Sequence, residues 1–158
     1  LVSAIPYSKY IALVVFVVAS LTDTLDGYIA RKYKLVSNFG KFMDPLADKL
    51  LVSSAMICLV SLNRIPAWVV IVIISREFII SGFRLVASDA GVVIAASWWG
   101  KIKTVVQMIM VIVLILSIHN PIVAVIEQIL IYLALVLTVV SLLDYLIKNW
   151  KVMDDGKM

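Results

Sequence analysis

The sequence is poor in charged residues, cysteine and histidine. Of its 158 residues, 15% are charged, one is a cysteine and one is a histidine. Soluble domains average about 25% charged residues, so the low charge argues against an ordinary water-exposed surface. Cys58 has no second cysteine to pair with, which excludes an intrachain disulfide, and we expect it to be a buried structural thiol. No basic stripe is interleaved with aromatic residues, so we expect no nucleic-acid partner.

Apolar residues take the place of the missing charge. They make up 63% of the sequence, against about 45–50% in soluble domains, and the mean hydropathy is +1.09. Turn residues divide the chain into five apolar stretches of about 20–26 residues, each long enough to cross a hydrocarbon core of about 30 Å as a helix. We therefore predict an all-α integral membrane protein, a single transmembrane domain over residues 1–158, with helices at 7–31, 39–62, 66–86, 95–118 and 122–147.

The positive charges are divided unequally between the two sides that five alternating helices would create. Only Lys9 and Arg64 fall on one side. The positive-inside tendency predicts that the other, cation-rich side faces the cytoplasm. That side holds Arg31, Lys32, Lys34, Lys41, Lys49, Arg84, Lys101, Lys103, Lys148, Lys151 and Lys157.

Four aspartates lie on this same side, within 26 residues. Asp23 and Asp26 are three residues apart near the end of the first helix, and Asp44 and Asp48 are four apart near the start of the second. Each spacing places two carboxylates on one helix face, and antiparallel packing would bring all four together. Such a group must bind protons or cations, and carboxylates are hard ligands suited to Mg²⁺, Mn²⁺ or Ca²⁺. Solvated interfacial charge is the alternative, which suits one such residue better than four.

The residues after the first aspartate pair suggest what the metals would act on. Gly27 and Ala30 leave room for a bulky group near the backbone, and Arg31 could pair with a phosphate. Two metal ions held by four carboxylates are used in phosphoryl-type displacements. We therefore expect a bound nucleoside diphosphate.

The spacing Asp23-x2-Asp26-Gly27-x2-Ala30-Arg31-x8-Gly40-x3-Asp44-x3-Asp48 resembles the signature of the CDP-alcohol phosphotransferases at all eight fixed positions. The segments "GKFMDPLADKLLVSS", "VIVIISREFIISGFRL" and "GKIKT" are similar to the bacterial branch that makes phosphatidylglycerophosphate. The similarity covers most of residues 20–105, and the last two helices are less distinctive.

The resemblance implies a fold and a reaction. It implies a homodimer in the bacterial cytoplasmic membrane, with six transmembrane helices per chain and an active site that faces the cytoplasm. Because this sequence predicts five helices, we expect the N-terminal helix of the family to be absent from it. The implied reaction transfers the phosphatidyl group from CDP-diacylglycerol to sn-glycerol 3-phosphate, giving phosphatidylglycerophosphate and CMP.

The resemblance also implies residue roles. Asp23, Asp26 and Asp44 would coordinate two divalent cations, Mg²⁺ or Mn²⁺. Asp48 would help to hold the second ion and would be the catalytic base for the acceptor hydroxyl. The cytidine diphosphate would be bound by Asp23, Asp26, Gly27, Ala30 and Arg31.

The phosphate of the acceptor needs cationic partners, and four residues on the cytoplasmic side are candidates. Arg76 and Arg84 are eight residues apart on the third helix, offset by roughly 80°, and Lys101 and Lys103 open the fourth helix. The two lysines could instead be interfacial anchors. Arg76 could instead pair with an acid, although we expect its neighbour Glu77 to point elsewhere on the helix, and a Glu77–Arg84 pair is also possible.

Three acidic or titratable residues fit no role in this scheme. His119 lies in a turn on the opposite side from the aspartates, so we expect no catalytic role for it. Glu127 and Asp144 in the last helix are left unassigned.

Two alternatives remain open. A sibling enzyme of the same family could use another alcohol, such as inositol phosphate, serine or phosphatidylglycerol, because the aspartate signature does not distinguish these acceptors. A divalent-cation transporter would use the aspartates as a transport site. Transport sites lie near the middle of the bilayer on several helices, whereas these acids gather at one interface.

Overall fold

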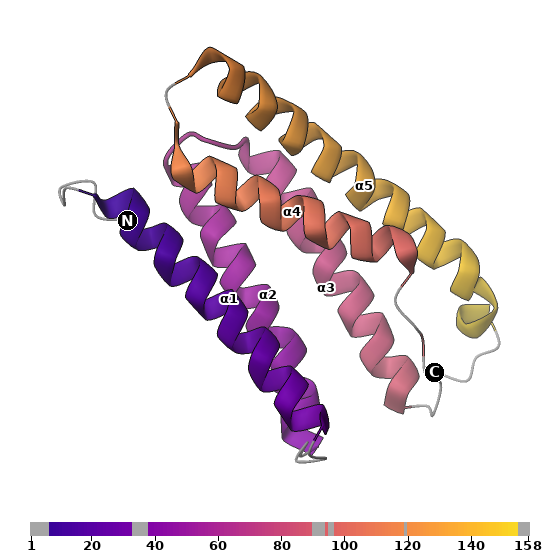
Figure 1. The fold of residues 1–158 in the computed structure, drawn as a ribbon. Coiled ribbons are helices and arrows are strands. Elements are labelled where there is room, and N and C mark those ends of the chain that lie inside the picture. Colours follow the sequence, from indigo (N-terminus) through magenta and orange to yellow (C-terminus); the bar gives the residue numbers. More distant parts are fainter. Residues whose placement is uncertain (1–6, 33–37, 90–93, 95–96, 119, 155–158) are drawn as a thin grey trace.

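The computed structural model describes residues 7–32, 38–89, 94, 97–118 and 120–154, and this part of the chain contains five α-helices and no strand (Figure 1). The helices are α1 (Ser8–Lys32), α2 (Asn38–Ser61), α3 (Ala67–Asp89), α4 (Trp98–Leu116) and α5 (Pro121–Asp154). Each corresponds to one predicted apolar stretch, so the all-α fold class is confirmed.

Local sequence explains where these helices begin and end. α4 is shorter than predicted because Ser97 caps its first turn, with the Ser97 Oγ accepting the Gly100 N–H at 3.2 Å, and because Ser117 adopts a left-handed conformation. α5 begins with Pro121 at its first position and continues past the predicted end at residue 147. No glycine or proline follows Pro121 before Gly156, so nothing in that sequence stops the helix earlier.

Successive helices alternate in direction (Figure 1). The C-termini of α1, α3 and α5 therefore lie toward the same end of the bundle as the N-termini of α2 and α4, at the lower right of the view. We call this the aspartate end. α4 and α5 pack most extensively against each other, and α3 packs against both α2 and α5.

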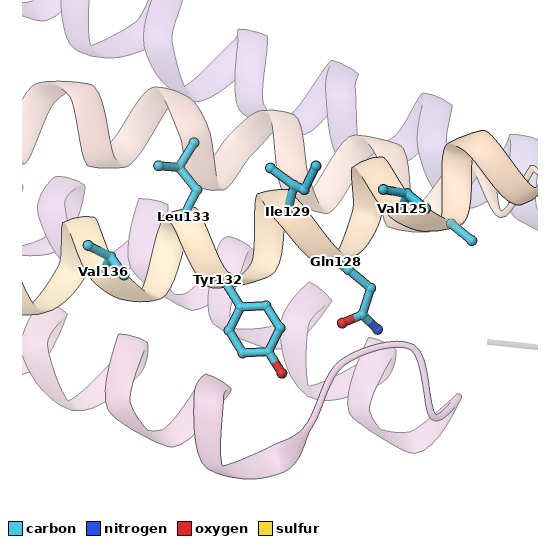
Figure 2. Close-up of a pocket in the computed structure, with 7 residues that line it drawn as sticks. Val125, Gln128, Ile129, Tyr132, Leu133 and Val136 are labelled. Atoms are coloured by element: carbon cyan, nitrogen blue, oxygen red, sulfur yellow. The ribbon is translucent and has the colours of Figure 1, made fainter.

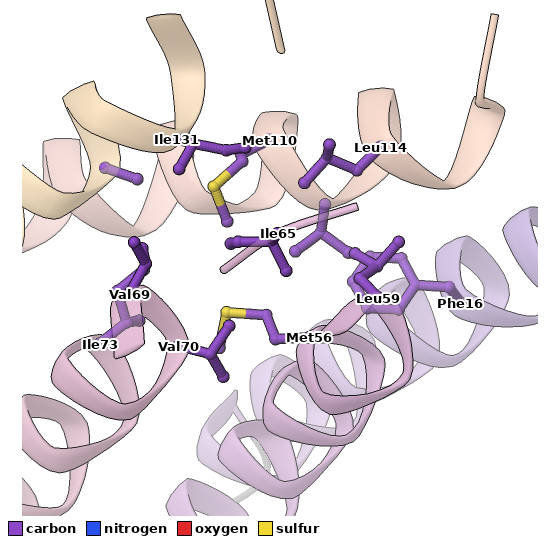
Figure 3. Close-up of a cluster of buried hydrophobic side chains, with 12 residues drawn as sticks. Phe16, Met56, Leu59, Ile65, Val69, Val70, Ile73, Met110, Leu114 and Ile131 are labelled. Carbon is purple, nitrogen blue, oxygen red and sulfur yellow. The ribbon is translucent and has the colours of Figure 1, made fainter. Parts of the chain in front are cut away.

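The hydrophobic core lies in the half of the bundle away from the aspartate end. All five helices contribute to it, and the side chains of Met56 and Met110 point into its middle (Figure 3). Because lipid tails are as apolar as these side chains, close van der Waals packing rather than removal from water is what draws the helices together in this cluster. The cluster comprises Phe16, Met56, Leu59, Ile65, Val69, Val70, Ile73, Met110, Val111, Leu114, Ile131 and Ala134.

Two buried hydroxyls in α5, those of Thr138 and Ser141, are satisfied without a partner on another helix. The Thr138 hydroxyl donates to the Ala134 carbonyl at 2.6 Å, and the Ser141 hydroxyl donates to the Thr138 carbonyl at 3.0 Å. Both residues are fully buried. These local bonds let α5 pack closely against its neighbours with no unpaired hydroxyl at either position.

The outer surface of the bundle is apolar, as expected for a protein in lipid. Large apolar side chains are exposed on every helix, among them Val15, Ile57, Ile71, Val105 and Ile147. By length and composition, two stretches can cross a membrane, Trp98–Leu116 and Pro121–Asn149. α1 and α2 have shorter apolar stretches, Ser8–Thr22 and Lys49–Ser61, and α3 carries charges within its length. Spanning by α1, α2 and α3 therefore stays a prediction.

Cys58 differs from its predicted environment. Its thiol is free, as expected, but the residue is only partly buried. It lies on α2, two residues after the core residue Met56 and one residue after the outward-facing Ile57.

Candidate active site

The four aspartates occupy adjoining segments of two antiparallel helices. Asp23 and Asp26 lie in the last three turns of α1, and Asp44 and Asp48 lie in the first three turns of α2. The two helices pack against each other, and these segments meet at the aspartate end (Figure 1). The side chains of the aspartates, and those of Gly27, Ala30 and Arg31, are outside the part of the chain that the structure describes.

The donor set fits the metals implied by the sequence. Four carboxylates provide the hard oxygen ligands that Mg²⁺ and Mn²⁺ prefer. Among the described side chains, no group of three His, Cys, Asp or Glu residues forms a metal site elsewhere. The α1–α2 segments are therefore the candidate metal centre.

A second charged group lies between α3 and α4. Glu77 Oε1 accepts a hydrogen bond from Arg76 Nη1 at 3.1 Å and another from Lys103 Nζ. We call these three residues the Glu77 cluster. The expectation that Glu77 points away from Arg76 is therefore wrong. Arg76 and Glu77 are neighbours in the sequence, and both side chains can bend toward the interior of the bundle. The Arg76 side chain is long, so its guanidinium can reach the Glu77 carboxylate there.

The Glu77 cluster is buried. Lys103 has no exposed surface and Arg76 is 7% exposed. An ammonium group without a counter-charge is very costly in such a place, which explains why Glu77 lies against it. The alternative that Lys103 is an interfacial anchor is wrong, since an anchor would extend its charge into the headgroups.

Gly100 helps to bring Arg76 close to α4. A Cβ atom at position 100 would lie 3.4 Å from Arg76 Nη2. The guanidinium therefore lies directly against the first turn of α4, and a larger side chain at position 100 would press on it. The cluster thus depends on a small residue in the "GKIKT" segment.

The other two predicted phosphate ligands lie outside the cluster. Arg84 Nε donates to the Ile94 carbonyl at 3.2 Å, and Arg84 does not pair with Glu77. Lys101 is exposed and its Nζ lies 5.0 Å from the centre of the Trp98 ring. The structure therefore brings Arg76 and Lys103 together and leaves Arg84 and Lys101 more exposed, toward the same end of the bundle.

Lys49 connects the two charged regions. It directly follows Asp48 on α2, and its charge acts on both Glu77 and Lys103. The segment of α2 that carries the second aspartate pair therefore lies near the Glu77 cluster. A substrate with two phosphate-bearing parts could reach both regions.

Sequence reasoning missed the role of Glu77. The signal was present, since an acidic residue beside an arginine inside an apolar helix must find a cation. Its actual partner, Lys103, lies 26 positions further along the chain, and a helical wheel of α3 alone does not show it.

The two other unassigned acids have structural partners. Glu127 Oε1 pairs with Arg64 Nη2 at 2.6 Å, while Arg64 Nη1 donates to Ser117 Oγ at 2.7 Å. Asp144 pairs with Lys148 one turn along α5, at 2.7 Å. His119, which was expected to be uninvolved in catalysis, is outside the described residues.

Two grooves on the outer surface are almost purely apolar. One, of about 660 Å³, follows the outward face of α5, where Gln128 is the polar exception (Figure 2). The other, of about 290 Å³, lies between α2 and α3 from Ile57 to Ser75. Neither of these two grooves is lined by the charged groups that transfer of a phosphate-linked group requires.

Comparison with known proteins identifies the family of the chain. The chain matches the family described as CDP-alcohol phosphatidyltransferase over residues 1–140. It is 49% identical over 152 residues to the CDP-diacylglycerol–glycerol-3-phosphate 3-phosphatidyltransferase of Bacillus subtilis (strain 168), with 94% of this chain and 78% of that protein covered. The protein of the same name from Haemophilus influenzae is 40% identical over 144 residues, with 88% and 77% covered.

A more distant relative is named in the same way. A probable phosphatidylglycerophosphate synthase of Mycobacterium tuberculosis is 38% identical over 138 residues, which cover 87% of this chain and 65% of that protein. The family match includes all four aspartates and the whole Glu77 cluster. With its helical membrane architecture, the chain belongs to the CDP-alcohol phosphatidyltransferase family.

Proposed function

We propose that the protein transfers the phosphatidyl group from CDP-diacylglycerol to sn-glycerol 3-phosphate and releases CMP. The observation that carries this proposal is the placement of the eight-residue aspartate signature on the adjoining ends of α1 and α2, beside the buried cations of α3 and α4. The names of the most similar relatives support the same donor and acceptor.

The reaction requires one bond to form and one to break. The primary hydroxyl of the acceptor attacks the phosphorus next to diacylglycerol, and the bond from that phosphorus to the oxygen of CMP breaks. Asp48 would take the hydroxyl proton. The cytidine diphosphate would be oriented by Gly27, Ala30 and Arg31, with Asp23 and Asp26 on the same face of α1.

The metal centre would be formed by Asp23, Asp26, Asp44 and Asp48 with two Mg²⁺ or Mn²⁺ ions. When bound, these ions supply the positive charge that offsets the diphosphate and the leaving CMP. Asp48 would then combine two roles, since one carboxylate oxygen can bind a cation while the other receives a proton.

The Glu77 cluster favours an acceptor that carries its own phosphate. Arg76 and Lys103 bring two cations to one carboxylate, and Arg84 and Lys101 add positive charge toward the same end. Serine would need no such group of cations. Inositol phosphate and phosphatidylglycerol also carry phosphate and remain the competing acceptors.

We further propose that the aspartate end faces the cytoplasm and that the protein works as a homodimer. The distribution of Lys and Arg supports the orientation. Family resemblance supports the dimer.

CMP release is the direct test of this function. Purified protein in lipid nanodiscs would be given CDP-diacylglycerol, Mg²⁺ or Mn²⁺, and glycerol 3-phosphate, inositol phosphate, serine or phosphatidylglycerol in parallel. We expect CMP release with glycerol 3-phosphate, its loss in EDTA, and its recovery on adding back Mg²⁺ or Mn²⁺.

The Asp48→Asn variant, compared with a control variant, distinguishes loss of the catalytic base from a general loss of structure. Because the amide is neutral and cannot take up the proton, we expect a fall in kcat of about 10²-fold or more, the size typical of a lost general base. Asp144→Asn is the matched control, since that aspartate lies outside the signature and pairs with an exposed lysine. CMP release by Asp48→Asn at the rate of Asp144→Asn would contradict the role of Asp48, and release with another alcohol alone would change the acceptor.

A further inference from the structure

Tyr145 is a buried residue on α5 that neither the motif nor the Glu77 cluster accounts for. It is 4% exposed, and its hydroxyl has no hydrogen-bond partner among the residues that the structure describes. A buried polar group without a partner is uncommon in proteins and calls for an explanation. A bound ligand is one such explanation.

A second unsatisfied donor lies on the neighbouring helix. Arg76 Nε is also buried without a partner in the described part of the chain, although Arg76 Nη1 binds Glu77. The charges of Arg84 and Arg76 both act on the Tyr145 hydroxyl. α3 and α5 pack against each other, and Tyr145 contacts Phe83 of α3. The two packed helices thus carry two donors without partners among the described residues and the cations Arg76 and Arg84, a combination that suits an anion with several acceptor oxygens.

The ring of Tyr145 is held in place by α3. It packs edge-on against Phe83, with ring centres 6.0 Å apart and planes at 88°. Phe83 directly precedes Arg84 in the sequence, so the same turn of α3 positions both the ring and a cation. A hydroxyl on a ring fixed in this way loses little freedom when it binds a ligand.

We propose that Tyr145 is a substrate-binding residue whose hydroxyl donates a hydrogen bond to the phosphate of the acceptor alcohol, alongside Arg76. The proposal rests on the proposed function and names a further residue of its acceptor site. It gives the enzyme a way to prefer phosphorylated over unphosphorylated alcohols, because a phosphate offers several charged acceptor oxygens to the two donors. In this arrangement α5 contributes to the site as well as to packing.

Tyr145→Phe tests the hydroxyl alone, since it keeps the ring against Phe83. Binding of glycerol 3-phosphate to nanodisc-embedded protein would be measured by calorimetry, independently of turnover, and the KM values for both substrates by CMP release. We expect the dissociation constant and the KM for glycerol 3-phosphate each to rise by about tenfold, the effect typical of losing one hydrogen bond to a charged group. The KM for CDP-diacylglycerol should not change.

Tyr132→Phe is the matched control, because Tyr132 is on the same helix but half exposed on its outward face. Equal glycerol 3-phosphate affinity in Tyr145→Phe and wild type, with turnover intact, would overturn the role of Tyr145 and leave the proposed function standing. A parallel rise in both KM values would also overturn it, since that result indicates a structural role. A wild-type protein that neither binds nor uses any phosphorylated acceptor would overturn both proposals.

Discussion

The buried ammonium group of Lys103 determines which charged side chains must lie beside it. A fully buried ammonium group must have a counter-charge, and Glu77 provides it while also contacting Arg76. One carboxylate therefore holds two cations in position, and the cluster retains a net positive charge for an incoming phosphate. Its residues come from α3 and α4, so it also ties those helices together.

Glu77→Gln should therefore destabilise the protein strongly. The amide still accepts a hydrogen bond but no longer neutralises Lys103, and removal of one partner of a buried pair costs about 3–5 kcal/mol. The free energy of unfolding in detergent would measure the loss.

Lys148→Gln provides the comparison for that measurement. It breaks the pair with Asp144, in which the lysine side chain is 62% exposed, so we expect a loss of less than about 1 kcal/mol. Replacing Lys103 with Met in the Glu77→Gln background should recover part of the stability, because no buried charge remains unpaired. Similar losses in Glu77→Gln and Lys148→Gln would contradict the structural role of Glu77.

At the scale of single residues, the sequence singled out four aspartates as candidate metal ligands, which stays a prediction, but it did not predict the ion pairs. The aspartates are recognisable because their spacing is local and follows the helical period. The partners of Glu77 and Glu127 were not predicted, because each lies on another helix and depends on how far a long side chain reaches.

The end of α2 illustrates how an element is terminated without glycine. Asn63 adopts φ 55°, its N–H donates to the Val60 carbonyl at 2.9 Å, and the Arg64 N–H donates to the Leu59 carbonyl at 2.9 Å. This pair of bonds satisfies the last carbonyls of the helix, as in a Schellman motif. The same turn then directs Arg64 toward Ser117 and Glu127.

The effect of a substitution at Asn63 on stability should depend on the backbone conformations open to the new residue rather than on the size of its side chain. Asn63→Val places a β-branched residue in the left-handed region, which costs about 1–2 kcal/mol. Asn63→Gly should leave stability within about 0.5 kcal/mol, because glycine adopts this conformation readily. Unfolding of both variants in detergent would be compared, and equal stability of the two would contradict the left-handed conformation at this turn.

Helix positions followed from the sequence, whereas some helix ends did not. The lengths of the apolar stretches and the turn residues between them placed all five helices. The serines at the two ends of α4 were not recognised as its limits. The polar residues after position 147 were not expected to be helical, because their polarity was given more importance than the lack of a helix-breaking residue.

Most cations of the molecule lie toward one end of the bundle, and its orientation in the membrane can be measured. Ser88 lies at the C-terminal end of α3 and Ser61 at the C-terminal end of α2, at opposite ends of the bundle, and both are exposed. In a Cys58→Ser background, we expect Ser61→Cys to react with a membrane-impermeant maleimide on intact cells. Ser88→Cys should react only after the membrane is opened.

The two variants control for each other, since each adds one thiol in place of a hydroxyl. Labelling of Ser88→Cys alone in intact cells would reverse the proposed orientation. Labelling of both would contradict the placement of the two ends on opposite sides of the membrane.

Fold class was predictable at this scale because hydropathy acts over whole helices, while the active-site end stays a prediction. The packing of both α3 and α4 against α5 was not predictable, since it depends on which apolar faces fit together. That placement is what brings Arg76, Lys103 and Tyr145 into one region.

The core described between Phe16 and Ala134 has an electrical consequence. Water and ions that enter the charged end meet a closely packed layer of methionine and branched aliphatic side chains one turn beyond Arg76 and two turns beyond Lys103. Gln107, whose amide contacts the Met56 sulfur at 3.6 Å, marks the boundary. Because ions are very costly to bring into a closely packed apolar layer, this core should oppose the leakage of ions along the inside of the bundle.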